Sequence, residues 1–219
     1  MTLRLAVLGD SIAFGQGAAR PEDRPAALFT RGLAASDIEV TARVFAVPGA
    51  RSAGLAAQVE RAVSWRPELA VVVIGANDLT HRVPVRTAAQ ALGEAVRRLR
   101  EHGAEVLVAP APDLSIVPQV PRAARSLVRA GSLWLRQAQA RAVRDAGGHV
   151  ADHGDTTESF AADPAMHFSA DSFHPSSAGY QVIAGALLPD LVALARDLTG
   201  VSGDGTRPPG TPRAPGRRS

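Results

Sequence analysis

Short apolar runs recur along the chain, and the clearest of them contain no polar position. Residues 69–74 read LAVVVI, a continuous run that is typical of a strand covered on both faces. Residues 38–47 alternate instead and are rich in β-branched side chains, as a strand with one more exposed face would be. The apolar pattern predicts strands at about residues 5–8, 38–47, 69–74, 105–109 and 149–151.

Between these runs, apolar residues recur at the three- and four-residue spacing of amphipathic helices. Ser52 is the expected N-cap of the helix that follows it. Gly131 is expected to bend or divide the longest helix, and Pro189 to kink or interrupt the last one. The predicted helices lie at about residues 25–35, 52–65, 86–102, 122–146 and 176–198.

Strands and helices therefore alternate along the whole chain. This alternation predicts an α/β fold, a three-layer α/β/α sandwich in which right-handed crossovers connect a five-stranded parallel sheet. We expect the flavodoxin-like strand order 2-1-3-4-5, which places the first strand beside a switch point of the topology. In such sheets ligands bind beyond the carboxyl ends of the strands, so the loops there are where chemistry is expected.

Length and charge set further bounds. The 219 residues are 46% hydrophobic, which suffices for one sizeable core, and we expect one domain over residues 1–199. Residues 200–219 are rich in Pro, Gly and Arg and are expected to be a disordered tail. All 24 basic residues are arginines, and without the tail the chain carries no net charge, so the composition does not favour a nucleic-acid partner.

Two absences narrow the expected location and chemistry. The sequence contains no cysteine, which excludes disulfides and thiolate nucleophiles. No run approaches the roughly 18 apolar residues of a membrane span, and the N-terminus lacks a signal-peptide pattern. The expected location is cytoplasmic.

The first strand stops at Gly9-Asp10-Ser11, which places a serine hydroxyl at the carboxyl edge of the sheet. A serine becomes a nucleophile when a base removes its proton, and His174 is the best candidate for that base. Asp171 precedes His174 by three residues, so a single turn can bring its carboxylate to the imidazole Nδ1. Pro175 disfavours helix at the histidine and starts one just beyond it.

Four sequence blocks together resemble a known family. GDS at 9–11, a lone Gly49 after the second strand, GAND at 75–78 and DSFHP at 171–175 look like those of the SGNH (GDSL-type) hydrolases. The resemblance covers residues 3–198 and implies a catalytic triad of Ser11, His174 and Asp171. It also implies an oxyanion hole formed by the Ser11 and Gly49 N–H groups and the Asn77 side-chain amide. Ala13 occupies the second glycine position of the GxSxG elbow, which argues against an ordinary α/β-hydrolase.

Each block alone has a plain structural reading. GDS can be a strand-to-loop turn, Gly49 a tight-turn glycine, Asn77-Asp78 a helix cap, and DSFHP the capped start of a helix. Only their joint order favours catalysis. Near the site, Asp10, Asp78 and His81 are candidate substrate-binding residues, with Asp10 also a brace for its loop.

No cofactor is expected. His149, His153 and His167 do not form a metal cluster with the acids around them, and GQG at 15–17 is too short for a phosphate loop and lacks its lysine. The expected function is that of a serine esterase or lipase that cleaves a small acyl ester through an acyl-Ser11 intermediate. An acyltransferase with the same residues and a non-catalytic binding protein are the alternatives.

The acyl group is expected to bind between two segments, residues 112–121 and 153–170. Their apolar side chains suit a short or medium acyl chain; they are Ile116, Val117, Phe160, Met166 and Phe168.

Overall fold

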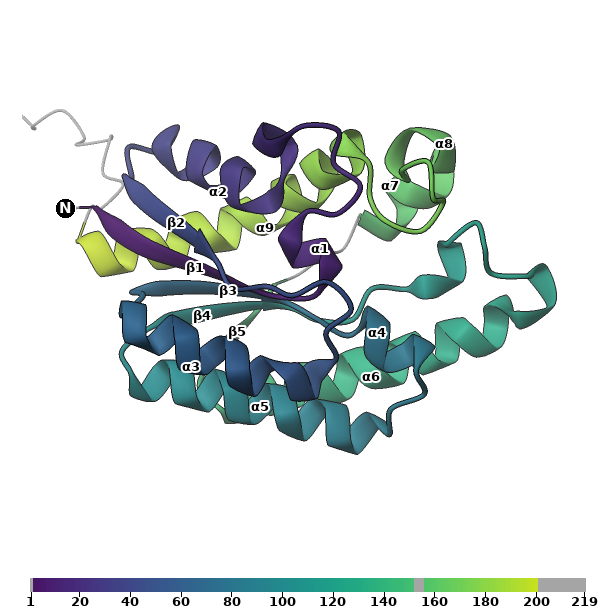
Figure 1. Ribbon diagram of the computed structural model, residues 1–219, viewed down its shortest axis with the longest axis horizontal. Helices are drawn as coiled ribbons and strands as arrows, with labels where there is room; N and C mark the ends of the chain where they lie inside the picture. Colours follow the sequence, from purple (N-terminus) through teal and green to yellow (C-terminus); the bar gives the residue numbers. More distant parts are fainter. Residues whose placement is uncertain (1, 152–155, 201–219) are drawn as a thin grey trace, which may run out of the picture.

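The structure is a computed structural model that describes residues 2–151 and 156–200. The predicted tail from residue 201 onward and His153 lie outside the described residues. Five strands form one parallel sheet in the order β2-β1-β3-β4-β5, as the alternation of strands and helices predicts (Figure 1). The strands are β1 (Leu3–Gly9), β2 (Val40–Val44), β3 (Leu69–Val73), β4 (Glu105–Ala109) and β5 (His149–Val150).

Helices cover both faces of this sheet (Figure 1). One face packs against α2 (Pro25–Ala34) and α9 (Ser177–Thr199), and the other against α3 (Leu55–Trp65), α5 (Val85–Glu101) and α6 (Arg125–Asp145). Strand β1 divides its side chains between the two layers: Leu5 and Val7 join the first core, while Ala6 and Leu8 join the second. All four are fully buried, which explains why the run is apolar at every position.

The expected cap at Ser52 is wrong, and the helices that contain Gly131 and Pro189 are neither divided nor interrupted at these residues. Ser52 does not cap α3 with its side chain; it begins a 3₁₀ turn, η2 (Ser52–Gly54), and donates its hydroxyl to Asp78 at 2.8 Å. The long helix starts with a 3₁₀ turn, η4 (Arg122–Ala124), and α6 then runs through Gly131 without a break. Pro189 lies inside an uninterrupted α9.

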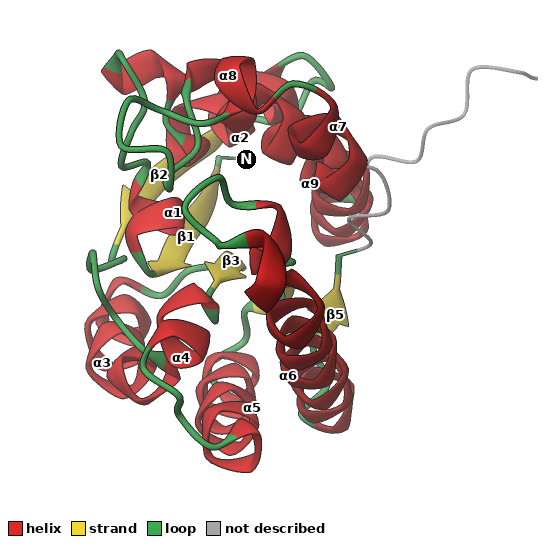
Figure 2. Cartoon of the chain, turned by 90° about the vertical axis from the view of Figure 1, so that its right-hand side faces the viewer, coloured by secondary structure: helices red, strands yellow, loops and turns green. Residues whose placement is uncertain are grey.

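Short helices occupy segments that lack a clear apolar period. They are α1 (Ser11–Phe14), η1 (Pro21–Asp23), α4 (Ala76–Thr80), η3 (Leu114–Ile116), α7 (Thr156–Ala162) and α8 (Pro164–His167). Viewed from the carboxyl ends of the strands, α1, α4, α7 and α8 gather around the sheet edge (Figure 2). The edge at which chemistry is expected is therefore lined by short helical turns as well as by the loops between them (Figure 2).

Helix α9 requires a further correction to the sequence analysis. By length and composition it could cross a membrane, with a mean hydropathy of 1.5 over its apolar window. In the structure, one of its faces packs into the core through residues such as Tyr180, Leu187 and Leu191, each fully buried. A central core helix and a membrane span share this composition, which makes the composition weak evidence for a span.

Candidate active site

The end of β1 is held in a conformation that only glycine tolerates. Gly9 has φ +133°, and a Cβ there would lie 1.8 Å from the Val73 carbonyl oxygen. The buried Gln58 side chain from α3 pairs with Gly9 twice, accepting from its N–H and donating to its carbonyl, each at 2.8 Å. Asp10 then caps α1 by accepting from the Ile12 N–H at 2.9 Å. These contacts place Ser11 at the first position of α1.

A histidine from the far end of the chain reaches this serine. His174 Nε2 lies 3.0 Å from Ser11 Oγ across 163 residues of sequence, and His174 Nδ1 lies 2.6 Å from Asp171 Oδ2. Ser11 is 6% exposed, so the hydroxyl is close to the surface but is shielded from bulk water. At these distances a serine hydroxyl can pass its proton to an imidazole whose position a carboxylate fixes.

The turn before His174 is organised by the Asp171 carboxylate. Its Oδ1 accepts from the Ser169 hydroxyl at 2.8 Å and from the Phe173 and His174 N–H groups at 2.9 Å each. Burial opposes ionisation of Asp171, but these hydrogen bonds and the one to the His174 ring outweigh it. They hold the pKa of the carboxyl well below its usual range. Asp171 is therefore a carboxylate that fixes the position of the imidazole.

Hydrogen bonds from the first turns of α9 connect the turn that carries His174 to the segment that carries Ser11. Ser176 caps the helix by accepting from the Gly179 N–H at 3.1 Å. One turn later, the buried Tyr180 donates its hydroxyl to the Gln16 carbonyl at 2.7 Å, just after α1. The Ser177 hydroxyl accepts from the Ala19 N–H at 3.0 Å. These tertiary hydrogen bonds hold the serine and histidine segments against each other.

The expected oxyanion donors come from the next two strand ends, which are joined to each other. Asn77, on α4, donates its amide to the Ala50 carbonyl at 3.1 Å. Gly49, one residue earlier, has φ +79° and no atom within 4 Å of the position a Cβ would take, so the space beside it is open. Asp78 completes the junction by accepting from the Ser52 N–H and hydroxyl.

Comparison with known proteins bears on this arrangement. A sequence model of the GDSL-like lipase/acylhydrolase family matches residues 7–182, the stretch that carries Ser11 and His174. The chain belongs to this family. It is 39% identical over 197 residues to GDSL-like esterase Rv1075c of Mycobacterium tuberculosis, covering 88% of this chain. The chain spans 61% of that relative's length.

Solved structures give the same fold at lower identity. TesA superposes with a TM-score of 0.68 at 22% identity, covering 87% of this chain and 99% of that one. The acetylxylan esterase Axe2 of Geobacillus stearothermophilus superposes with a TM-score of 0.68 at 18% identity, covering 86% and 94%. At such identities, the likeness shows the shared three-layer fold.

Two of the three candidate substrate-binding residues are buried in the protein interior. Asp10 is 0% and Asp78 is 1% exposed, so neither side chain faces a substrate, and the expectation for them is wrong. Burial raises the pKa of Asp10 to about 7, and its Oδ2 has no hydrogen-bond partner among the described residues. His81 is exposed at the end of α4, with Nδ1 2.9 Å from the Asn77 carbonyl oxygen. Asp10 and Asp78 act as braces for the loops.

The sequence analysis overlooked two buried glutamines that hold the strand ends. Gln58 pairs with Gly9, and Gln139 on α6 accepts from the Ala111 N–H at 2.8 Å and donates to the Ile74 carbonyl at 3.4 Å. Both are at most 1% exposed. Gln139 falls between Leu135 and Val143 on the buried stripe of α6, and that position is the signal that could have identified it.

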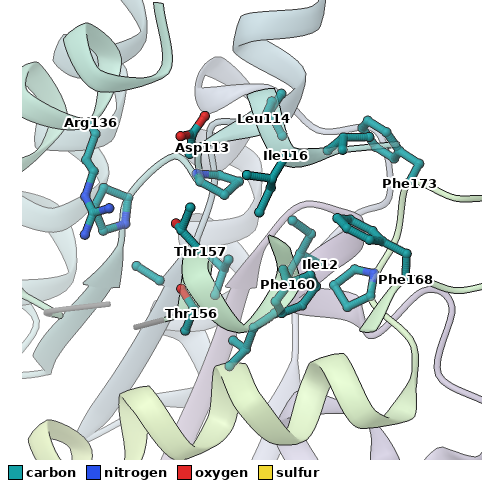
Figure 3. Close-up of a pocket in the computed structure, with 17 residues that line it drawn as sticks. Ile12, Asp113, Leu114, Ile116, Arg136, Thr156, Thr157, Phe160, Phe168 and Phe173 are labelled. Atoms are coloured by element: carbon teal, nitrogen blue, oxygen red, sulfur yellow. The ribbon is translucent and has the colours of Figure 1, made fainter. Parts of the chain in front are cut away.

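An apolar pocket lies next to the Ser11–His174 pair (Figure 3). Its volume is about 100 Å³, and Ile12, Phe173 and Pro175 in its wall are chain neighbours of Ser11 and His174. Four of the five side chains expected to contact the acyl group line it, namely Ile116, Val117, Phe160 and Phe168. Met166 does not; it is 57% exposed on α8 and points elsewhere.

The described histidines that were not expected to form a metal cluster each contact a different partner. His149 Nε2 lies 3.1 Å from Glu105, and His167 Nδ1 lies 3.0 Å from the Asp163 carbonyl oxygen. Within residues 2–151 and 156–200, no group of three or more His, Asp or Glu side chains could hold a metal ion.

Proposed function

We propose that this protein is a serine esterase in which Ser11 attacks the carbonyl carbon of a small carboxylic ester. The observation that carries the proposal is the contact of Ser11 Oγ with His174 Nε2 at 3.0 Å, with Asp171 at 2.6 Å from the other ring nitrogen. A hydroxyl with both a base and an orienting carboxylate is the arrangement that activated serine nucleophiles require.

The proposed proton transfers follow from the positions of Ser11, His174 and Asp171. His174 takes the Ser11 proton as Oγ bonds to the acyl carbon, and it returns that proton to the departing alkoxide, which leaves as an alcohol. Water repeats the sequence on the acyl-Ser11 ester: His174 takes a water proton, hydroxide adds to the carbonyl, and Ser11 leaves with its hydroxyl restored. Asp171 stays ionised and balances the imidazolium charge throughout.

The charge on the tetrahedral oxygen needs donors that are already in position. The Ser11 and Gly49 N–H groups and the Asn77 amide are proposed for this role, each worth about 3 kcal/mol of transition-state stabilisation. The Ala50 carbonyl uses one amide proton of Asn77 and leaves the other to donate. This bond also fixes the rotation of the amide, so no reorientation is needed as the oxyanion forms.

The ester's acyl chain is proposed to enter the apolar pocket beside Ile12 and Phe173. A volume of about 100 Å³ suits roughly four carbon atoms, because a cavity of about 150 Å³ holds the six carbons of a benzene ring. Rv1075c and Axe2 are both named as esterases, which agrees with ester hydrolysis here.

Labelling with a fluorophosphonate probe tests the nucleophile. Ser11→Ala is expected to abolish both labelling and p-nitrophenyl butyrate hydrolysis while the fold persists, since only a hydroxyl is removed. Ser64→Ala is the matched control, because that serine is exposed on α3 and bonds only to the Glu60 carbonyl within its own helix. Labelling that survives in Ser11→Ala would assign the nucleophile to another residue.

A further inference from the structure

The apolar pocket has two chemically different ends. Of its 17 lining residues, four are polar, and Figure 3 shows them on the side opposite Ile12, Phe168 and Phe173. At the apolar end, Ile12 and Phe173 are the chain neighbours of Ser11 and His174. A chain that enters from the reacting carbonyl therefore passes apolar walls first and meets polar groups at its far end. The four polar lining residues are Asp113, Arg136, Thr156 and Thr157.

Arg136 is the unusual member of this polar end. It lies in the middle of α6, is half-buried, and makes no ion pair or hydrogen bond to another described residue. Arg4 and Arg100, which are also partly buried, each pair with a glutamate. A guanidinium that lies partly against apolar walls loses hydrogen bonds to water. An anion in suitable geometry can replace them with charge-assisted hydrogen bonds.

The nearby carboxylate does not fill that role. Asp113 accepts from the Ser115 N–H at 2.9 Å to cap η3, and its other oxygen faces Arg129 Nε at 3.8 Å. Thr157 adds a hydroxyl that makes no hydrogen bond to another described residue, and Figure 3 places it between Asp113 and Thr156. The far end thus offers the Arg136 fork and a hydroxyl donor without a committed acceptor.

We propose that the pocket binds an acyl chain that ends in a carboxylate, so the preferred substrates are half-esters of short dicarboxylic acids. Arg136 is the specificity-determining residue, and it forms the two parallel hydrogen bonds that a guanidinium makes with a carboxylate. The proposal rests on the proposed function for the reacting end of the substrate. A volume of about 100 Å³ holds about four methylenes, so we choose an adipate half-ester, with four methylenes between ester and carboxylate, as the test substrate.

Substrates of equal length isolate the terminal charge. We compare kcat/KM for the mono-p-nitrophenyl ester of adipate with that for p-nitrophenyl hexanoate at constant ionic strength. The wild type is expected to favour the half-ester by 10-fold or more. Arg136→Met keeps an unbranched stem and removes the charge, and it is expected to lower the ratio at least 10-fold.

Three further variants test whether the substrate preference depends on charge at the polar end of the pocket. Arg98→Met removes the same charge from the exposed surface of α5 and is expected to leave the ratio and the basal activity unchanged. Asp113→Asn removes the carboxylate that lines the polar end of the pocket and is expected to raise the ratio. Arg136→Glu is expected to reverse the preference, favouring the ester of 6-aminohexanoate over the adipate half-ester.

A binding measurement separates this proposal from the proposed chemistry. Calorimetry with the Ser11→Ala variant is expected to show tighter binding of monomethyl adipate than of methyl hexanoate, and Arg136→Met in that background is expected to remove the difference. A ratio and a binding difference that both survive Arg136→Met overturn the proposal. A wild type without hydrolysis whose adipate binding still depends on Arg136 contradicts the proposed function and leaves the pocket assignment standing.

Discussion

Replacing Asp10 by asparagine tests how strongly the interior beneath Ser11 disfavours charge. Asp10 is fully buried, its Oδ1 caps α1, and its Oδ2 has no partner among the described residues. Burial raises the pKa of this carboxyl from 3.8 to about 7, and the nearby Asp78 charge adds to the rise. Asparagine keeps the capping oxygen and cannot ionise.

The sign of the effect follows from proton binding. Between pH 4 and 7 the unfolded chain releases the Asp10 proton while the folded protein retains it, so the free energy of unfolding falls as pH rises. Below this window both states are protonated, and above it both are ionised and the loss is complete. The rise in the Asp10 pKa from 3.8 to about 7 corresponds to roughly 4 kcal/mol in full, of which about 2–3 kcal/mol develops between pH 5 and pH 8.

Urea unfolding of wild type and Asp10→Asn at pH 5 and pH 8 measures this directly. The stability of the variant relative to wild type is expected to improve by about 2–3 kcal/mol between the two pH values. Comparing the pH values cancels any constant cost of placing an amide there. Asp37→Asn, which removes the same formal charge from an exposed position, is expected to show no such change within about 0.5 kcal/mol. A relative stability of Asp10→Asn that is equal at both pH values would refute the reasoning.

Three other predictions follow from the site. If Asp171 acts only through His174, Asp171→Asn is expected to lower kcat by about 10³- to 10⁴-fold with a nearly constant KM. The double variant with His174→Ala should then be about as slow as His174→Ala alone, and losses that multiply in steady-state kinetics would contradict the assignment. Gln58→Leu leaves the Gly9 N–H buried without a partner and is expected to cost about 1–3 kcal/mol in urea unfolding; a change below about 0.5 kcal/mol would contradict it. Ile116→Trp narrows the pocket and is expected to lower kcat/KM for p-nitrophenyl hexanoate at least 10-fold more than for the acetate; equal losses would show that the acyl chain binds elsewhere.

Much of the fold was readable from local patterns. The continuous apolar runs predicted strands of a parallel sheet, because a strand buried on both faces has no polar positions to alternate with. The strand order agrees with the flavodoxin-like topology that the alternation of strands and helices suggested. The order of the GDS, Gly49, GAND and DSFHP blocks, together with the family resemblance, identified the residues that the structure brings together at the sheet edge. Position after a strand was enough, since parallel strands deliver their carboxyl ends to one side.

Only the tertiary structure decided what surrounds those residues. Whether a carboxylate faces substrate or lies in the interior depends on contacts across the sequence, and Asp10 and Asp78 read as polar loop residues until their burial is known. Gln58 reaches Gly9 across 49 residues, and Arg136 meets the pocket through the packing of α6 against η3, in the segment after β4. The local spacing of apolar residues contains no information about such distant partners. It reports which face of an element is apolar but not which polar side chain that face encloses.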